Sequence, residues 1–217
     1  TQSGRQAHDN HQDSQWCWNN LAAEYGTENN FYYEDNTYIG PGIVVSAGGQ
    51  GNRYCVRHNT ITNTDTSVFW MFDMHGSYTE DMLSAMVVEV YGNTINSAYG
   101  VGSLDQRGSM ALFYNNIFSC STVDIGIRNE YNTNVDLLSP VTATNGEPKR
   151  IHKSYYWGNK NKGTRVSAAI LETAYYSNLG RNVPQFNLDI WDEASPFTGA
   201  TGVGVGTLSA RPATCTT

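Results

Sequence analysis

Acidic, basic and imidazole side chains gather in one stretch of this 217-residue chain. Seven of them lie between positions 73 and 107: Asp73, His75, Glu80, Asp81, Glu89, Asp105 and Arg107. Carboxylates beside His or Arg are the groups that general acid–base reactions use, and sets of carboxylate oxygens bind hard cations such as Ca²⁺. This stretch is the first candidate for chemistry, although His75, which Gly76 follows, also fits a simple turn.

A second stretch combines positive charge with aromatic rings. All four lysines lie in residues 149–162, and Arg150 and Arg165 bring the positive charges of residues 149–165 to six, with no acid among them. The whole chain has a net charge of −7, so the remainder is strongly acidic. A basic segment that also holds Tyr155, Tyr156 and Trp157 is typical of binding to an anionic polymer. The alternative is a solvated loop that balances an acidic body.

The composition indicates a compact β protein. Charged residues make up 15% of the chain, against an average near ~25%, while there are 22 Asn, 21 Thr and 21 Gly. A content of 12% aromatic residues excludes a disordered chain, and four Lys argue against a helical bundle. No run approaches the ~18 apolar residues of a membrane span. The elements to be expected are short strands joined by tight turns.

A repeat runs through the chain. Five segments align on a shared Asn: FYYEDNTY (31–38), YCVRHNTI (54–61), VEVYGNTI (88–95), ALFYNNIF (111–118) and SYYWGNKN (154–161). Apolar residues lie three and five places before this Asn and two places after it, so they share one face of each strand. The pattern predicts parallel strands stacked about 4.8 Å apart, with a column of Asn that tolerates the left-handed conformation and bonds from coil to coil. An antiparallel sandwich is the alternative.

In this register the chain resembles the right-handed parallel β-helix superfamily, which has the pectate-lyase-like fold. The segments RYCVRHNTITNT, FDMHG and MVVEVYGNTIN are also similar to uncharacterised bacterial extracellular β-helix proteins. The resemblance implies an all-β solenoid over residues 28–190. The spacing of apolar residues predicts short capping or flanking helical segments, one in the stretch WCWNNLAAEY (16–25) and one at 166–180. Residues 1–27 are then a polar tail with an N-terminal cap, and residues 191–217 are a C-terminal extension that leads into further sequence.

The outward positions of the same register form an aromatic stripe. In β-helix proteins one such sheet face usually binds an extended glycan, so the resemblance implies a glycan-binding set. Its members are aromatic or basic: Tyr91, Tyr114, Tyr155, Trp157, Lys153 and Lys160. The alternative is that another segment covers the stripe and makes it part of the core.

The resemblance to lyases and hydrolases implies catalytic roles as well. The candidate bases are Arg57, His75 and Arg107, and the candidate Ca²⁺ ligands are Asp73, Glu89 and Asp105. The R-x-P-x-x-R element of lyases and the Gly-His-Gly element of hydrolases are absent, so no complete catalytic set is assembled. We therefore expect an extracellular, non-catalytic surface, matrix or appendage protein that binds polysaccharide or self-assembles, with no cofactor. The alternative is an enzyme on an acidic polysaccharide, a lyase (with Ca²⁺) before a hydrolase.

The four cysteines are even in number and form no C-x-x-C pair: Cys17, Cys55, Cys120 and Cys215. This favours a secreted or cell-surface protein with two disulfides, in any of three pairings, over a protein with four free thiols. The partners we expect are polysaccharide and, through uncapped coil ends, further copies of the chain. Nucleic acid and a membrane span are not expected.

Overall fold

The computed structural model describes residues 24–26, 30–41, 46–48, 51–64, 70–76, 84–128, 150–171 and 184–193. These residues form an all-β structure of seventeen short strands. No helix occurs among the residues so described, and hence none there that could span a bilayer.

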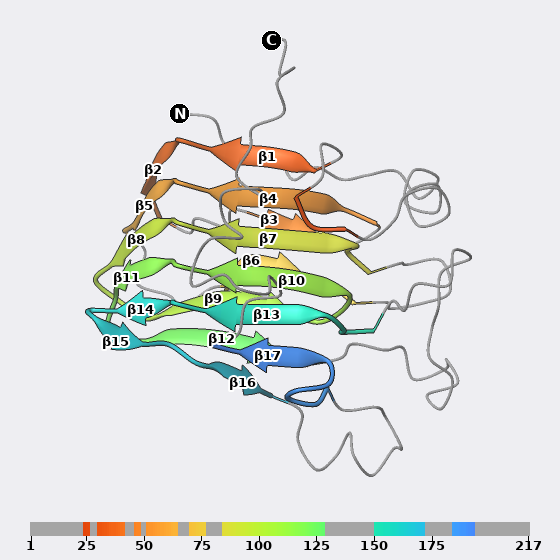
Figure 1. Ribbon diagram of the computed structural model, residues 1–217. Helices are drawn as coiled ribbons and strands as arrows, with labels where there is room; N and C mark the ends of the chain where they lie inside the picture. The colour runs from red at the N-terminus through yellow and green to blue at the C-terminus, as the bar shows by residue number, and fades with distance from the viewer. Residues whose placement is uncertain are drawn as a thin grey trace.

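The strands belong to three sheets, which we call A, B and C (Figure 1). Sheet A holds β1 (Phe31–Glu34), β4 (Arg53–Arg57), β7 (Val87–Tyr91), β10 (Met110–Tyr114), β13 (Ser154–Trp157) and β17 (Ile190–Asp192). Sheet B holds β2 (Thr37–Gly40), β5 (Thr60–Asn63), β8 (Thr94–Ser97), β11 (Ile117–Ser119), β14 (Lys160–Asn161) and β15 (Thr164–Arg165). Sheet C holds β3 (Ser46–Gly48), β6 (Trp70–Met74), β9 (Val101–Gln106), β12 (Val123–Ile127) and β16 (Ala168–Ile170).

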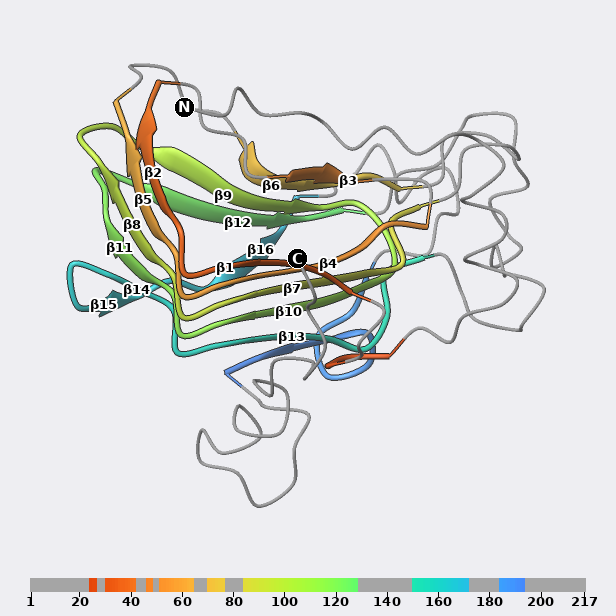
Figure 2. The same ribbon diagram turned by 90° about the horizontal axis from the view of Figure 1, so that it is seen from above.

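From β1 to β14 successive strands enter sheets A, B and C in turn, so every third strand returns to the same sheet beside the previous one. Strand β15 then turns back onto β14, and β16 and β17 rejoin sheets C and A. The pairings are parallel except for the hairpin of β14 and β15, which ends sheet B. Seen from above, the three sheets surround a common interior (Figure 2). This arrangement of stacked parallel strands is compatible with a β-helix.

The bend between sheets A and B explains the Asn repeat. The residue before each of these Asn has a positive φ: Asp35, His58, Gly92, Asn115 and Gly158. These are the residue types that adopt the left-handed conformation most readily. The left-handed residue is therefore the one before the repeated Asn, whereas the repeat had predicted that the Asn itself takes this conformation.

The repeated Asn residues form a continuous hydrogen-bonded ladder. The side-chain carbonyl of Asn93 accepts from the backbone N–H of Asn59 at 3.0 Å and from its Nδ2 at 3.0 Å. The same pair of bonds joins Asn36 to Asn59, Asn93 to Asn116, and Asn116 to Asn159. The Nδ2 atoms also donate to backbone carbonyls, such as that of Val56. The predicted column of stacked Asn is confirmed, and it satisfies buried polar groups that would otherwise be costly.

The inward faces of the three sheets share one apolar core. In sheet A the predicted inward positions Val56, Val90 and Phe113 are fully buried. Sheets B and C add Ile61, Ile95, Phe118, Phe72, Leu104 and Ile125 to the same cluster. The apolar positions of the repeat therefore face the interior in the central copies. The prediction is wrong for Phe31 in the first copy, which is 69% exposed.

The helical segments that the sequence suggested are not seen. Within the predicted helix at 166–180, Ala168–Ile170 is strand β16, because it pairs in parallel with β12 through Ala168 and Ile125. Tertiary pairing has overridden the helix-like spacing there. Residues 172–180 and 16–23 lie outside the described part of the chain, and Glu24–Gly26 is not helical.

Candidate functional site

The aromatic stripe on the outer face of sheet A is buried. Tyr91 and Tyr114 are inaccessible to solvent, and Trp157 is 9% exposed. Their rings stack in sequence, with centroids 4.6 Å apart for Tyr91 and Tyr114 and 4.1 Å apart for Tyr114 and Trp157. The structure thus agrees with the alternative prediction, in which another segment covers the stripe. The faces of these rings are not open to a sugar.

The covering segment includes residues just before the first strand. Tyr25 packs edge-on against Tyr155, and its hydroxyl donates to the carbonyl of Lys153 at 2.5 Å. The backbone N–H of Gly26 and the Nδ2 of Asn30 both donate to Oε1 of Glu89, at 2.7 and 2.6 Å. Tyr155 is half-buried and stacks on Trp191, whereas Lys153 and Lys160 are exposed. Of the six predicted glycan-binding residues, the two lysines are the accessible ones.

Arg57 and Glu89 belong to this covered face of sheet A. Arg57 is 2% exposed, pairs with Glu34 at 2.6 Å and donates to the Tyr91 hydroxyl at 2.9 Å. Burial raises the pKa of Glu89, although the bonds from Gly26 and Asn30 and the charges of Arg57 and Arg53 act in the opposite direction. A buried guanidinium bound to a carboxylate is a poor base, so Arg57 does not fit the role expected of it.

The other predicted candidates meet on the outer face of sheet C. Asp73 of β6 and Asp105 of β9 are partners in the parallel register. Two residues beyond them, His75 and Arg107 leave their strands, and the N–H of Arg107 donates to the carbonyl of Met74 at 2.9 Å. The acids and the bases thus form two adjacent columns across the coils.

Ion pairs link the two columns, and Arg128 of the next coil extends the basic one. Nη2 of Arg107 lies 2.5 Å from Oδ1 of Asp73, and its Nε lies 3.3 Å from Oδ2 of Asp105. Nη2 of Arg128 lies 2.7 Å from the same Asp105 oxygen, and Nε2 of His75 lies 3.0 Å from Oδ2 of Asp73. Arg107 therefore bridges two carboxylates of adjacent coils. We call these five residues the sheet C cluster.

The sheet C cluster is partly accessible, and its two acids differ. The side chain of Asp73 is 23% exposed and that of Asp105 only 2%. Burial acts to raise the pKa of Asp73, but the hydrogen bonds and charges of His75 and Arg107 outweigh it, so this pKa is lowered. Burial raises the pKa of Asp105 despite Arg128 and Arg107, and the charge of Asp73 adds to the rise. Neighbouring carboxyls with pKa values moved apart are the arrangement that an acid–base pair requires.

An indole ring lies over glycines on the same face. A Cβ at Gly102 would come within 2.7 Å of the Trp70 ring, and one at Gly126 within 2.9 Å of its far edge. Gly126 is the register partner of Asp105, so the far edge of the Trp70 ring lies next to the strand position that adjoins Asp105. Trp70 is half-buried. Two glycines on successive coils thus leave room for the Trp70 ring, and Leu171 packs over Gly126 beside it.

A short repeat in the sequence marks this site. FDMHG (72–76) and LDQRG (104–108) repeat the order apolar residue, Asp, any residue, base, Gly. The two segments occupy equivalent positions at the ends of β6 and β9. Comparing them would have joined Asp73 to Asp105 and His75 to Arg107. Trp70, Gly102 and Gly126 have no comparable signal in the sequence.

The predicted calcium set is not assembled. Asp73 and Asp105 are neighbours on sheet C, but Glu89 lies on the covered outer face of sheet A. Across the residues that the structure describes, no group of three or more His, Cys, Asp or Glu side chains is placed to hold a metal ion. The prediction failed because the linear cluster at 73–107 is divided between two sheets.

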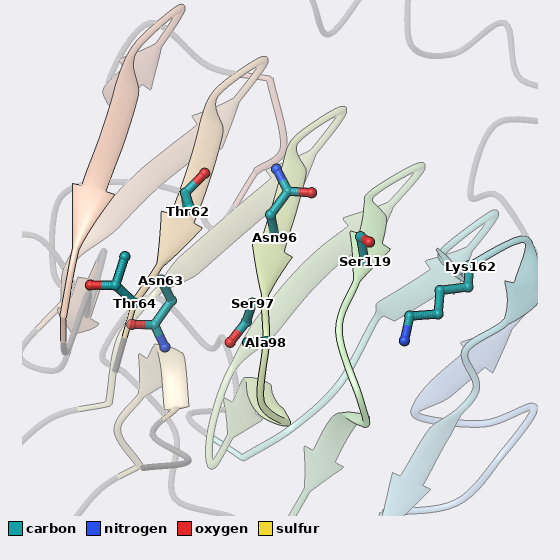
Figure 3. Close-up of a pocket in the computed structure, with 8 residues that line it drawn as sticks. All are labelled: Thr62, Asn63, Thr64, Asn96, Ser97, Ala98, Ser119 and Lys162. Atoms are coloured by element: carbon teal, nitrogen blue, oxygen red, sulfur yellow. The ribbon is translucent and has the colours of Figure 1, made fainter. Parts of the chain in front are cut away.

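A polar groove lies on the outer face of sheet B (Figure 3). It has a volume of about 600 Å³ and is lined by Thr62, Asn63, Thr64, Asn96, Ser97, Ala98, Ser119 and Lys162. Thr62, Asn96 and Ser119 are register partners on β5, β8 and β11, and Lys162 follows β14. The sequence did not single out this face, because its residues carry hydroxyl and amide groups rather than rings or acids.

Two of the cysteines are not in disulfides. Cys55 and Cys120 are buried free thiols, whereas Cys17 and Cys215 lie outside the described residues. Cys55 faces outward from sheet A, beneath Tyr32 and Tyr91, whereas Cys120 belongs to the interior core. Cys55 and Cys120 cannot pair with each other, since the two thiols lie on opposite sides of the sheets. The pairings that involve Cys17 or Cys215 lie outside the described residues.

Comparisons with known proteins identify no relative. No protein-family model matches this chain, no curated protein matches it, and no solved structure matches it.

Proposed function

We propose that this chain is an extracellular right-handed parallel β-helix protein that binds a polysaccharide on the outer face of sheet C. The β-helix is supported by three sheets that the chain enters in turn and by the Asn ladder at one bend. The proposed secreted or cell-surface location rests on the class of ligand. Disulfides do not support it, because Cys55 and Cys120 are free thiols.

One observation carries the proposed binding. A half-buried Trp70 ring lies across Gly102 and Gly126, one coil position from a cluster of carboxylate, guanidinium and imidazole groups. Flat aromatic rings stack on the faces of sugars, and paired charged groups hydrogen-bond sugar hydroxyls. The outer face of sheet A has more rings, but they are covered.

The test is retention of the protein on gels that contain neutral or acidic polysaccharides. We expect Trp70→Leu to reduce retention, while Trp191→Leu, which alters a ring of sheet A, serves as the matched control. Circular dichroism of both variants verifies that they are folded. Equal retention of the Trp70 variant and the native protein would contradict the proposed site.

A second candidate function is hydrolysis of the bound polysaccharide. Two carboxyl groups that are register partners on the face of Trp70, Asp73 and Asp105, favour it, together with the opposite directions of their pKa displacements. Asp105, with the raised pKa, would act as the acid, and Asp73, with the lowered pKa, as the base. The lyase alternative loses the calcium set that the sequence had suggested for it.

Size-exclusion chromatography of the polymer after incubation with the protein measures whether the polymer is shortened, and so distinguishes catalysis from binding alone. If the pair is catalytic, Asp105→Asn and Asp73→Asn should each lower the rate by about 10²–10⁴-fold. Asp124→Asn, an exposed acid of β12, is the control and should leave the rate unchanged. Absence of shortening by the native protein across the polymers would leave binding as the function.

A further inference from the structure

We propose that the outer face of sheet B binds one chain of an anionic polysaccharide, which runs across the coils from Thr62 toward Lys162. This inference shares with the proposed function only the class of ligand, because it concerns a different sheet. It rests on the groove, on the register of its polar side chains and on the charge at one end.

One row along the groove presents one polar side chain per coil. Thr62 pairs in register with Asn96, and Asn96 with Ser119, so their outward side chains repeat at the strand spacing of about 4.8 Å. Figure 3 shows these three side chains on neighbouring strands with Lys162 at the end of the row. Hydroxyl and amide groups at a fixed repeat suit a ligand whose own hydroxyls and carboxylates repeat along a chain.

The charge of this face is of one sign. The outward row next to the groove consists of Thr37, Thr60, Thr94, Ile117 and Lys160, all exposed. No acid lines the groove, and neither Lys160 nor Lys162 has an acidic partner among the described residues. Arg165, by contrast, pairs with Asp192 and Glu193. Two unneutralised ammonium groups beside polar uncharged side chains favour an anionic ligand over a neutral one.

The position of Lys162 is fixed by the preceding coil. Its backbone N–H donates to the carbonyl of Phe118 at 2.9 Å. The side chain of the adjacent Asn161 accepts from the N–H of Cys120 at 3.0 Å and donates to its carbonyl at 3.1 Å. The turn continues through Gly163, and both Lys162 and Gly163 have a positive φ. The ammonium group is therefore carried on an anchored turn, which lowers the entropy cost of binding.

A polysaccharide fits this face better than a second copy of the chain. The exposed apolar residues of sheet B, Ile39 at 73% and Ile117 at 59%, lie in different register rows on β2 and β11, and strands β5 and β8 lie between those two strands. They form no continuous apolar patch of the kind that dimer interfaces bury.

The test measures the dissociation constant of the full chain for polygalacturonate and for the same polymer after methyl esterification. We expect the esterified polymer to bind more weakly, and Lys160→Gln with Lys162→Gln to raise the dissociation constant for polygalacturonate by about three- to tenfold. Lys160→Arg with Lys162→Arg should restore binding. Lys153→Gln removes an exposed charge elsewhere and is the matched control.

The outcomes separate this inference from the proposed function. Loss of binding in the Lys160/Lys162 variant but not in the Lys153 variant supports the sheet B site, whatever the Trp70 variant does. Equal binding of acid and ester, or equal binding by all lysine variants, overturns it while leaving the sheet C site intact. Sedimentation of the native protein as a dimer that dissociates on Ile117→Lys would also overturn it, since a second copy would then occupy the face.

Discussion

The outer faces of sheets A and B are built from adjacent segments of the same coils. The outer face of sheet A is a second buried cluster, whereas the outer face of sheet B is exposed to solvent. A single left-handed residue and the ladder Asn separate Tyr91 on sheet A from Thr94 on sheet B. Tyr91 is fully buried, whereas Thr94 is exposed. The alternation of a strand decides which side chains leave the coil, but a distant segment decides whether those side chains meet water.

The largest effect is expected at the bend that separates the two faces. Asn93→Ala leaves the buried backbone N–H of Asn59 without an acceptor, removes one of the three bonds of the Asn59 Nδ2, and removes three donor bonds of Asn93 itself. At roughly 1–3 kcal/mol for an unsatisfied buried donor and about 0.5–1.5 kcal/mol for each other bond lost, we expect a loss of about 4–6 kcal/mol in the free energy of unfolding, measured with urea. Asn36→Ala, at the exposed end of the ladder, should lose about 1 kcal/mol. Similar losses for both variants would show that the ladder adds no more inside than at its end.

The next effect contrasts the two faces directly. Tyr114→Ala removes a fully buried ring from between Tyr91 and Trp157, and such a substitution costs ~3–5 kcal/mol. Thr94→Ala, on the exposed face, should change the free energy of unfolding by less than about 0.5 kcal/mol. If Tyr114→Ala were as mild as Thr94→Ala, the outer face of sheet A would be uncovered in solution.

Sheet C supplies an intermediate case, because a ring covers only part of it. Gly102→Ala forces the Trp70 ring away and should cost ~1–3 kcal/mol by overpacking. In a Trp70→Ala background the same glycine substitution should cost little, and the double-mutant cycle measures the difference. Gly40→Ala is the control, since a Cβ there meets no atom within 4 Å. Equal costs of Gly102→Ala in both backgrounds would place the ring elsewhere.

The smallest effect is in the pH dependence, and its sign differs between a covered and an open acid. The raised pKa of Glu89 makes the folded protein bind more protons than the unfolded chain above the ordinary value of 4.5, so its contribution to stability falls as the pH rises through that window. The lowered pKa of Asp73 gives stability that is present above its ordinary value of 3.8 and is lost as the pH falls.

Urea titrations at a series of pH values measure both contributions. Relative to Glu89→Gln, the native protein should lose stability as the pH rises above 4.5. Relative to Asp73→Asn, it should lose stability as the pH falls below 3.8. Slopes of the same sign for the two comparisons would show that Glu89 is solvated, and hence that the segment at Gly26 and Asn30 does not cover it.

Much of the fold follows from the sequence because the coil is periodic. The repeated Asn at positions 36, 59, 93 and 116 fixes the register of the strands in sheets A and B. The inward apolar positions follow from that register. Sheet C has no such marker, and its strands lie at irregular distances from the ladder. This is why Ala168–Ile170 was given to a helix although it pairs with β12.

The candidate site was predicted in part. Asp73, His75, Asp105 and Arg107 meet as a cluster because equivalent positions of successive coils are neighbours. Glu89 and Arg57 do not join them, since the same coils carry those residues to a different sheet. The sequence does not predict whether Tyr114 is buried, because its burial depends on a covering segment around Tyr25, about ninety positions earlier in the chain.

The Asn ladder also gives the chain a direction during its synthesis. In every step the side-chain carbonyl comes from the later coil, and the donors come from the earlier one. A nascent chain that has made Asn59 but not Asn93 therefore holds a backbone N–H whose acceptor has not yet been translated. Each new coil completes the one before it, so ordering should proceed with a lag of one coil behind the ribosome, and a truncation should leave its last coil unfinished.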